Sequence, residues 1–221
     1  EGEFALVDTG FSEQFEQLSA YLDERKVTSI SFILLTHFHR DHYGNIPALI
    51  EKYRVKRVYL KEYSGLDSTT AWGTAADDAY RQAEMDKYLA MQELVRKKSE
   101  LVQVEDINEI RFGPYTLQLF GTKNTIREIY EDFTVPETYH KITCTENQNS
   151  IAVWMKAEGK NIFLGGDIMD APSVHPLANF VNQRFAKAIG EQMDLYKVPH
   201  HGTVHTGTKE ALAIYKPRHC I

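Results

Sequence analysis

Four side chains of metal-binding type fall within six consecutive positions of the chain: His37, His39, Asp41 and His42. Imidazole nitrogens and carboxylate oxygens are ligands that zinc takes in proteins. His37 and His39 alternate with Phe38, so an extended backbone would point both imidazoles to one side. A few surface histidines near a turn would be the ordinary interpretation, but four such ligands directly after an apolar run predict a metal site.

Further ligand candidates lie far along the chain, each at the end of an apolar run. Asp167 follows two glycines after the run 161–164, and His200 and His201 follow the run 193–198. Strand ends of a rigid sheet can deliver such side chains into one shared cleft. Taken alone, Asp167 would be an ordinary turn aspartate. Its position between the histidine cluster and the His-His-Gly segment favours a metal ligand.

The elements that must position these residues follow an alternating rhythm of strands and helices. The apolar run 32–35 is typical of a buried strand, and Asn45 and Pro47 then predict an N-cap and an early helical proline. Helices are expected to begin at Ser12 and to span about 46–53, 75–98, 176–189 and 209–215, with no strand after the last. We expect strands at 4–7, 31–36, 57–61, 101–104, 115–120, 151–155, 161–164 and 193–198. This alternation predicts an α/β protein.

Composition places the chain among ordinary globular proteins. Its 221 residues are 43% hydrophobic and 25% charged, with a net charge of −6. No basic run is long enough to follow a nucleic-acid backbone, which counts mildly against an obligate nucleic-acid binder. No apolar stretch approaches the roughly 18 residues that a membrane span needs. The chain shows neither a signal peptide nor an initiator methionine, so it looks excised or processed, and its compartment cannot be read. Cys144 and Cys220 would form one disulfide or stay reduced.

The pattern His-x-His-x-Asp-His over positions 37–42 resembles the signature of the metallo-β-lactamase superfamily. The resemblance implies an αββα four-layer sandwich formed by one domain over residues 1–221. The usual opening strands before Phe4 and closing strands after Tyr215 are missing, which leaves two alternatives open: a complete sandwich or one truncated at both ends. The resemblance also implies that Asp167 bridges two metal ions, with a hydroxide between them that attacks the substrate.

A closer resemblance, to the catalytic modules of bacterial cell-wall phosphorylcholine esterases, covers nearly the whole chain. The matching segments are 4–10, 32–45, 58–64, 147–150, 164–167 and 194–197. This resemblance implies an extracellular or cell-surface phosphodiesterase that uses two Zn²⁺ ions, with Mn²⁺ as the alternative, on a small phosphodiester or choline-phosphate substrate. The implied metal ligands are His37, His39, Asp41, His42, Asp167 and His201, with His200 beside them rather than among them.

A second resemblance, to the soluble domain of competence-type DNA-uptake proteins, rests on two segments. These are the Asn-x-x-Ser segment 147–150 and the Val-Pro-His-His-Gly ending 198–202. The alternative function is therefore a metal-dependent nuclease, and other hydrolases of the superfamily, such as thioesterases and lactamases, remain open. A non-enzymatic binding module is opposed by the six intact ligand positions, because a decayed site would be expected to have lost at least one.

The superfamily resemblance also shows one departure in this chain and implies two proton-transfer roles. Many members carry a further ligand histidine where this chain has Asn149, so one metal would hold an additional water. Asp41 would act as a ligand and as a proton acceptor. Either His200 or His205 would protonate the leaving oxygen.

The substrate contacts are predicted from aromatic and polar residues outside the ligand set. Aromatic rings could pack a quaternary ammonium by cation–π attraction, although each ring alone would more often serve ordinary packing. The polar segment 121–146 has no periodicity and would form a loop over the metal site. The predicted contacts are Tyr63, Trp72, Tyr130, Asn149 and His205.

Overall fold

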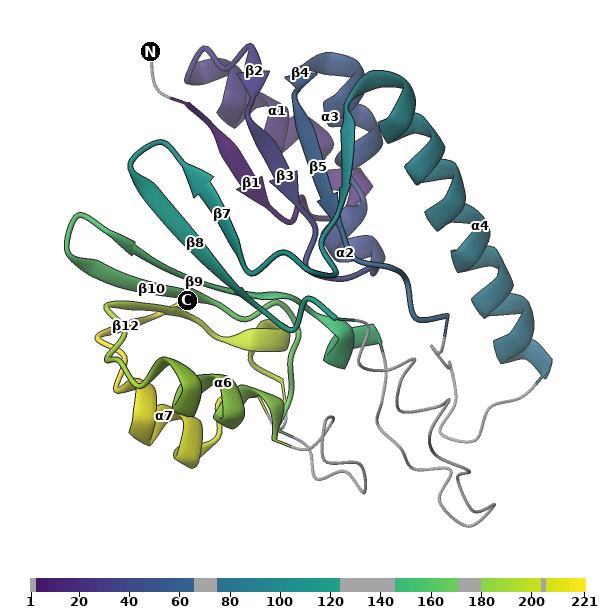
Figure 1. The fold of residues 1–221 in the computed structure, drawn as a ribbon. Coiled ribbons are helices and arrows are strands. Elements are labelled where there is room, and N and C mark those ends of the chain that lie inside the picture. Colours follow the sequence, from purple (N-terminus) through teal and green to yellow (C-terminus); the bar gives the residue numbers. More distant parts are fainter. Residues whose placement is uncertain (1–2, 66–74, 124–145, 171–179, 204–205) are drawn as a thin grey trace.

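The computed structural model describes residues 3–65, 75–123, 146–170, 180–203 and 206–221. Two sheets lie face to face, and helices cover the outer face of each (Figure 1). This arrangement confirms the predicted αββα four-layer sandwich. None of the described helices is long and apolar enough to cross a membrane.

The first sheet is parallel and carries the histidine cluster at the end of one central strand. Its strands lie in the order β1-β3-β5-β6. Parallel strands place all their C-terminal ends at one edge, so the loops after β1, β3 and β5 meet there. Their bounds are Ala5–Val7 for β1, Phe32–Leu34 for β3, Arg57–Leu60 for β5 and Glu100–Gln103 for β6.

Helices cover the outer face of this sheet, and a small strand pair lies beside it. The short strands β2 (Ser29–Ile30) and β4 (Arg54–Val55) pair in parallel beside it. The 3-10 helix η1 spans Ser12–Gln14, and the α-helices span Phe15–Glu24 (α1), Arg40–Tyr43 (α2), Ile46–Lys52 (α3) and Ala75–Lys98 (α4). The sequence placed Asp41 and His42 in a turn, whereas they lie in the short helix α2.

The second sheet is mixed and supplies the remaining ligand candidates. Strands β7 to β10 are antiparallel, and β10, β11 and β12 run parallel. The strands span Glu109–Phe112 (β7), Tyr115–Phe120 (β8), Ala152–Ala157 (β9), Lys160–Leu164 (β10), Leu195–Lys197 (β11) and His219–Cys220 (β12). Helices α6 (Val181–Ile189) and α7 (Lys209–Tyr215) cover its outer face, and the 3-10 helices η3 and η4 span Glu146–Asn149 and Pro199–Gly202.

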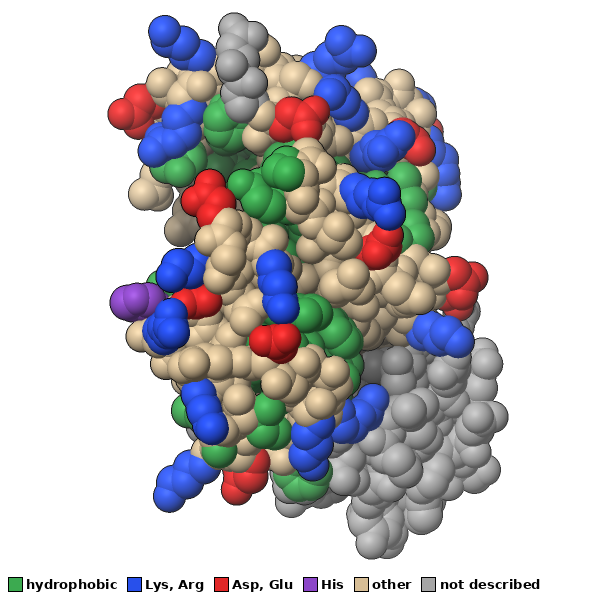
Figure 2. Space-filling view, turned by 60° about the vertical axis from the view of Figure 1, so that its left-hand side comes forward, with side chains coloured by type: hydrophobic (Ala, Val, Ile, Leu, Met, Phe, Trp, Pro, Cys, Tyr) green, Lys and Arg blue, Asp and Glu red, His purple; other side chains and the backbone are tan. Residues whose placement is uncertain are grey.

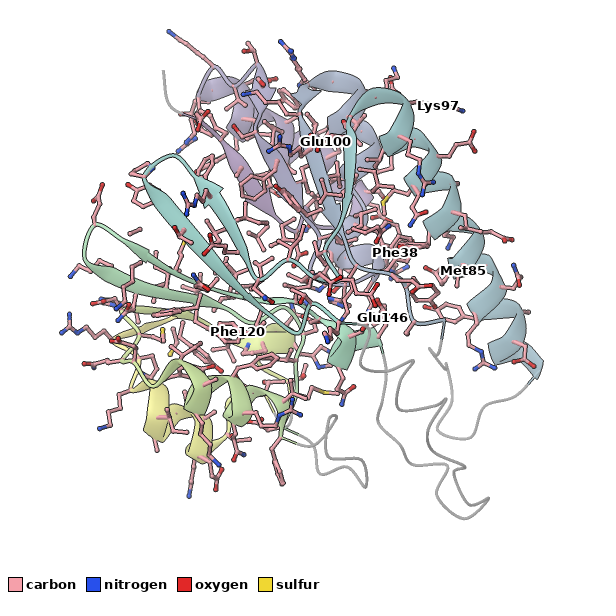
Figure 3. All side chains as sticks on the ribbon, in the orientation of Figure 1. Phe38, Met85, Lys97, Glu100, Phe120 and Glu146 are labelled. Atoms are coloured by element: carbon pink, nitrogen blue, oxygen red, sulfur yellow. The ribbon has the colours of Figure 1, made fainter. Side chains whose placement is uncertain are left out.

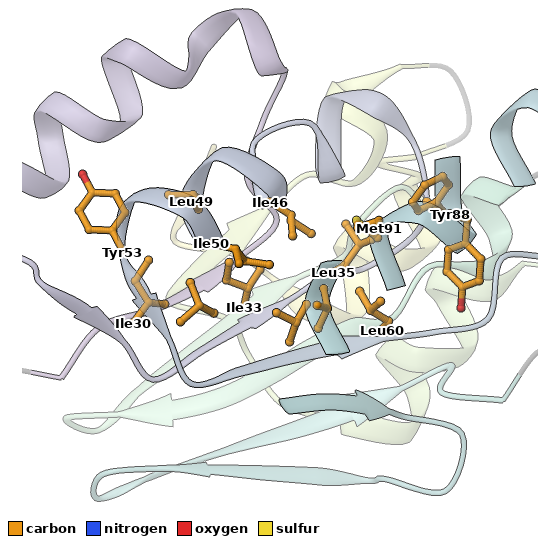
Figure 4. Packing of buried hydrophobic residues seen from close by; sticks show 14 of the residues in the cluster. Ile30, Ile33, Leu35, Ile46, Leu49, Ile50, Tyr53, Leu60, Tyr88 and Met91 are labelled. Carbon is orange, nitrogen blue, oxygen red and sulfur yellow. The ribbon is translucent and has the colours of Figure 1, made fainter. Parts of the chain in front are cut away.

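Three apolar clusters lie between the four layers, because neighbouring strand residues point to opposite faces. In β3, Ile33 packs toward the helices, while Phe32 and Leu34 pack between the two sheets. Figure 4 shows the helix-side cluster, in which Leu49 and Met91 meet the strands of the first sheet. In β11, Tyr196 belongs to the third cluster, beneath α6 and α7. This alternation fixes which strand residues face the cleft between the sheets.

Some sequence expectations about element ends are wrong. The expected absence of a strand after the last helix fails, because β12 pairs with β11. Asn45 occupies the N-cap position of α3 but makes no capping bond, since its amide donates to the carbonyl oxygen of Thr9 instead. Cys220 is exposed in β12, and Cys144 lies outside the described residues.

Candidate metal centre

Six ligand-type side chains converge where the strand ends of the two sheets meet. The loop after β3 and helix α2 supply four of them, the turn after β10 supplies Asp167, and η4 supplies His201. They form two groups, each with ligand atoms within 4.8 Å of one another, and Asp167 belongs to both. The first group is Asp41, His42, Asp167 and His201, and the second is His37, His39 and Asp167.

The four-ligand group is tightly drawn together. His42 Nε2 lies 3.3 Å from Asp167 Oδ2 and 3.5 Å from Asp41 Oδ2. His201 Nε2 lies 3.0 Å from Asp41 Oδ2 and 3.7 Å from Asp167 Oδ2. Two nitrogens and two carboxylates thus face one small volume, an arrangement that suits a divalent ion with nitrogen and oxygen ligands.

The second group repeats this geometry with fewer ligands. His37 Nε2 lies 3.0 Å from His39 Nδ1 and 3.7 Å from Asp167 Oδ2. His37 and Asp167 are buried, while His39 is partly exposed. Asp167 lies between the groups, so one carboxylate could contact an ion in each.

The pattern of satisfied and unsatisfied atoms fits metal ligation. Several buried side-chain polar atoms of the described residues lack a hydrogen-bond partner, and two of them are His42 Nε2 and Asp167 Oδ1. A buried polar atom with no partner is costly, and native proteins normally satisfy it. Both atoms belong to the candidate ligand set, so a cation would satisfy them.

Electrostatics favour a positive charge among these carboxylates. Burial alone would lower the pKa of His42, but the carboxylates of Asp167, Asp41 and Asp8 raise it to about 11. Burial would raise the pKa values of the Asp41 and Asp167 carboxyls, yet contact with His42 holds both below the ordinary value. Burial, together with His42, lowers the pKa of His37 well below normal. The neutral imidazole that results at His37 is the form that binds a metal.

Asp8 and Thr36 fix the orientation of two ligand histidines, a role that the sequence did not predict. Asp8 Oδ2 lies 2.7 Å from His42 Nδ1, which leaves Nε2 directed at the ligand group. Thr36 Oγ1 lies 3.0 Å from His37 Nδ1, with the same result for that ring. The Thr36 backbone N–H and hydroxyl both donate to Asp8. Such partners set the tautomer and direction of a ligating histidine. The only sequence signal was the Asp-Thr-Gly turn after β1.

The two glycines before Asp167 allow a close approach of backbone segments. Gly166 has a φ of +55°, and a Cβ there would lie 2.9 Å from Ser150 Cβ and 3.0 Å from Thr36 Cβ. The backbone N–H of Asp167 donates to Ser150 Oγ at 3.0 Å. Both contacts hold Asp167 against the loop that carries the histidines. Glycine is needed here for its conformation and for its size.

Glu146 is a further positioning residue that the sequence analysis did not identify. Its buried carboxylate accepts hydrogen bonds from the backbone N–H groups of Phe38 and Ser64, each at 3.0 Å. Figure 3 shows Glu146 and Phe38 where the histidine loop meets η3. Phe38 lies between His37 and His39, so the carboxylate fixes the backbone that presents both rings.

The structure separates His200 from His201. Both have left-handed backbones within η4, with φ values of +48° and +54°. They follow strand β11 rather than lying on it, so alternation along a strand does not decide which of them reaches the ligand group. His201 joins the four-ligand group. His200 Nε2 is 4.0 Å from Asp167 Oδ2 and 3.1 Å from Asn147 Nδ2, and its Nδ1 is 2.8 Å from Thr203 Oγ1. It therefore lies beside the candidate ligand groups and contacts two polar neighbours, Asn147 and Thr203.

Of the five predicted substrate contacts, two are buried and three lie outside the described residues. Tyr63 is 2% exposed and packs with Phe38 and Tyr88 in the helix-side core, which contradicts a substrate role, because a buried ring cannot meet a ligand. Asn149 is also buried, and its amide donates to the Glu62 carbonyl oxygen. Trp72, Tyr130 and His205 lie outside the described residues, as does segment 121–146 apart from 121–123 and 146.

Several known proteins resemble this chain in sequence. The sequence model of the metallo-beta-lactamase superfamily matches residues 1–208. ComE operon protein 3 of Bacillus subtilis (strain 168) is 22% identical over 211 residues, which cover 96% of this chain and 22% of that protein. Cleavage and polyadenylation specificity factor subunit 3-I of Arabidopsis thaliana is 26% identical over 130 residues, or 52% of this chain and 18% of that protein.

An archaeal protein resembles the chain in both sequence and structure. The metallo-beta-lactamase fold-containing protein ST1585 of Sulfurisphaera tokodaii is 27% identical over 131 residues, or 55% of this chain and 45% of that protein. The crystal structure of ST1585 aligns with a TM-score of 0.43 at 18% identity, covering 85% of this chain and 67% of that chain. The chain spans less than half the length of these curated relatives.

Proposed function

The chain belongs to the metallo-β-lactamase superfamily, whose sequence model matches most of its length, and we propose that it is a metal-dependent hydrolase of phosphodiesters. The observation that carries this proposal is the pair of ligand groups that share Asp167. Two cations about 3.5–4 Å apart are the usual arrangement for in-line displacement at phosphorus. The sequence offers no convincing serine or cysteine nucleophile, so the proposed reaction does not need a covalent intermediate.

The proposed metal ligands are the six residues of the two groups. We propose two Zn²⁺ ions, with Mn²⁺ as the alternative: the first would be held by Asp41, His42, Asp167 and His201, and the second by His37, His39 and Asp167. When bound, the ions would supply a water of lowered pKa and would neutralise charge on the phosphate oxygens. Both halves of the chain contribute ligands, which supports the proposal that residues 1–221 act as one domain.

His200 is proposed to donate a proton to the leaving oxygen, and Asp41 to accept one besides holding a metal. His200 lies beside the ligand groups without joining them. Its burial lowers the pKa of the imidazole. The donor would therefore be most effective in mildly acidic solution, since a general acid must carry its proton at the working pH.

A phosphorylcholine ester is the proposed substrate. This proposal is based on the resemblance to phosphorylcholine esterase modules and on the net charge of the chain. The net charge of −6 gives a polyanion little attraction from the overall field. Figure 2 shows lysine and arginine side chains interspersed with acidic ones over one face of the molecule. Tyr63 is buried in the core, so Trp72 and Tyr130 are the remaining aromatic residues proposed to contact the ammonium group.

A metal-dependent nuclease is the second candidate. The match to ComE operon protein 3 extends over 96% of the chain and favours it, as does the cleavage factor subunit. Both candidates cleave a phosphodiester with the same metal centre. They differ in whether the cleft receives a small cationic ester or a nucleic-acid strand.

A substrate panel with zinc-loaded and manganese-loaded protein tests the proposal. It contains a nitrophenyl ester of phosphorylcholine, bis-nitrophenyl phosphate, single-stranded DNA, a thioester and a β-lactam, with Asp167→Asn as the inactive control. We expect turnover of the choline ester to exceed that of bis-nitrophenyl phosphate, with little cleavage of DNA. Efficient DNA cleavage with the choline ester untouched would replace the esterase with the nuclease. Cleavage of only the thioester or the β-lactam would refute phosphodiester hydrolysis.

A further inference from the structure

A cavity beside the metal centre contains one lysine to which the proposed reaction assigns no role. The cavity has a volume of about 290 Å³, at the lower end of the range for ligand pockets. Asp41, His42 and His201 of the four-ligand group line it together with Lys197. A group bound in this cavity would thus touch the candidate metal centre and Lys197 at once.

Strand geometry directs Lys197 into the space between the sheets. Tyr196, its neighbour in β11, is fully buried in the cluster beneath α6 and α7. Side chains alternate along a strand, so Lys197 points to the opposite face. Its partner in β10 is Leu164, which packs against the cluster between the sheets and also lines the cavity. The Lys197 side chain therefore extends toward the cleft side from a rigid strand.

The acids that line the cavity already have other partners. Asp8 accepts two hydrogen bonds from Thr36 and contacts His42. Asp41 contacts His42 and His201. Within the part of the chain that the structure describes, Lys197 forms no ion pair with either of them. Its charge is left for a group that enters the cavity.

We propose that Lys197 forms an anion subsite that binds a phosphate oxygen of the substrate beside the metal centre. The proposal rests on the proposed function and deepens it, since it names the group that holds the charged part of a phosphodiester. A lysine ammonium is a compact charge with three donors and is well suited to phosphate. At about 4 Å and an effective dielectric constant near 20, the attraction is large enough to change affinity at least tenfold.

Direct binding of inorganic phosphate tests the subsite without any catalytic turnover. Zinc-loaded protein freed of unbound zinc is titrated by calorimetry as wild type, Lys197→Met, Lys197→Arg and Lys160→Met. Lys160 is the matched control. It is an exposed lysine in the neighbouring strand β10, at the end away from Leu164, and it pairs with Asp194. We expect Lys197→Met to weaken phosphate binding about tenfold or more, Lys197→Arg to recover most of it, and Lys160→Met to leave it unchanged.

Unchanged affinity in Lys197→Met, or no phosphate binding by the wild type, would overturn the subsite. Loss of zinc from Lys197→Met would also overturn it, because the lysine would then act on the metal centre itself. Turnover adds a second arm: the KM for bis-nitrophenyl phosphate should rise in Lys197→Met, while the KM for uncharged nitrophenyl acetate should not.

The two arms separate this proposal from the proposed function. If the wild type cleaves no phosphodiester yet binds phosphate through Lys197, the function fails and the subsite stands. If the wild type cleaves phosphodiesters, but Lys197→Met changes neither the affinity for phosphate nor the KM for bis-nitrophenyl phosphate, the subsite fails and the function stands.

Discussion

At the scale of single residues, the types and spacing of the ligand candidates were the main basis for predicting a metal site. Six residues selected from sequence converge in two groups that share Asp167. Their types alone restricted the chemistry, because clustered imidazole and carboxylate groups are the ligands that zinc takes. Asp8 and Glu146 were not predicted, since their roles depend on contacts with residues far away in sequence. No local pattern encodes such contacts.

The two adjacent histidines of η4 provide a residue-scale test. His201→Ala should lower the zinc content by about one ion per chain, because it removes a ligand from the four-ligand group. His200→Ala should keep the zinc and lower kcat by about 100-fold, as loss of a general acid does. Metal analysis and steady-state kinetics on the same preparations measure both. The reverse pattern would show that the two assignments are exchanged.

The pKa of His42 predicts proton release on metal binding. In the metal-free fold this pKa is raised from 6.5 to about 11, so the imidazole carries its proton at pH 8. That proton stabilises the metal-free fold fully below pH 6.5, and its contribution is lost as the pH rises through about 11. A metal at Nε2 must displace it.

Zinc titration at pH 8 in buffers of different ionisation enthalpy should therefore reveal the release of about one proton from His42. The apparent zinc affinity should increase with pH up to about 11. His42→Gln, which carries no such proton, serves as the control. Zinc binding without any proton release would contradict the assignment of His42 as a ligand.

At the scale of elements, long periodic segments were predicted well and short ones poorly. Helix α4 at Ala75–Lys98 and strand β8 at Tyr115–Phe120 have the predicted bounds, because each repeats its apolar residues over many positions. The strand β12 was missed, since its two residues, His219 and Cys220, offer no alternation. Its pairing with β11 supplies the structure that its sequence does not show.

The turn between β10 and Asp167 gives a prediction at this scale. Gly166→Ala adds a Cβ that would lie about 3 Å from the Ser150 and Thr36 side chains. Gly113→Ala is the matched control, because Gly113 has the same φ of +55° and open space around it. Urea unfolding of the metal-free proteins should show a loss of about 1 kcal/mol for Gly113→Ala and roughly 1–3 kcal/mol more for Gly166→Ala. Equal losses would mean that the close approach is unimportant.

At the scale of the whole molecule, the alternation of elements predicted the α/β class, and the family resemblance implied the four-layer sandwich. The candidate metal centre lies where the ends of both sheets meet, so both halves of the chain contribute residues to it. The substrate side was harder to predict. Aromatic residues serve packing and recognition alike, and Tyr63 was assigned to the cleft when it belongs to the core.

Metal content per chain tests the central claim most directly. Protein purified without chelator, loaded with zinc and dialysed, should contain about two zinc ions per molecule by elemental analysis. Asp167→Asn should retain fewer than about one, because two cations would then face each other without the shared carboxylate. Its activity should fall by about 100-fold or more. A wild-type protein that binds no zinc or manganese after loading would contradict the account.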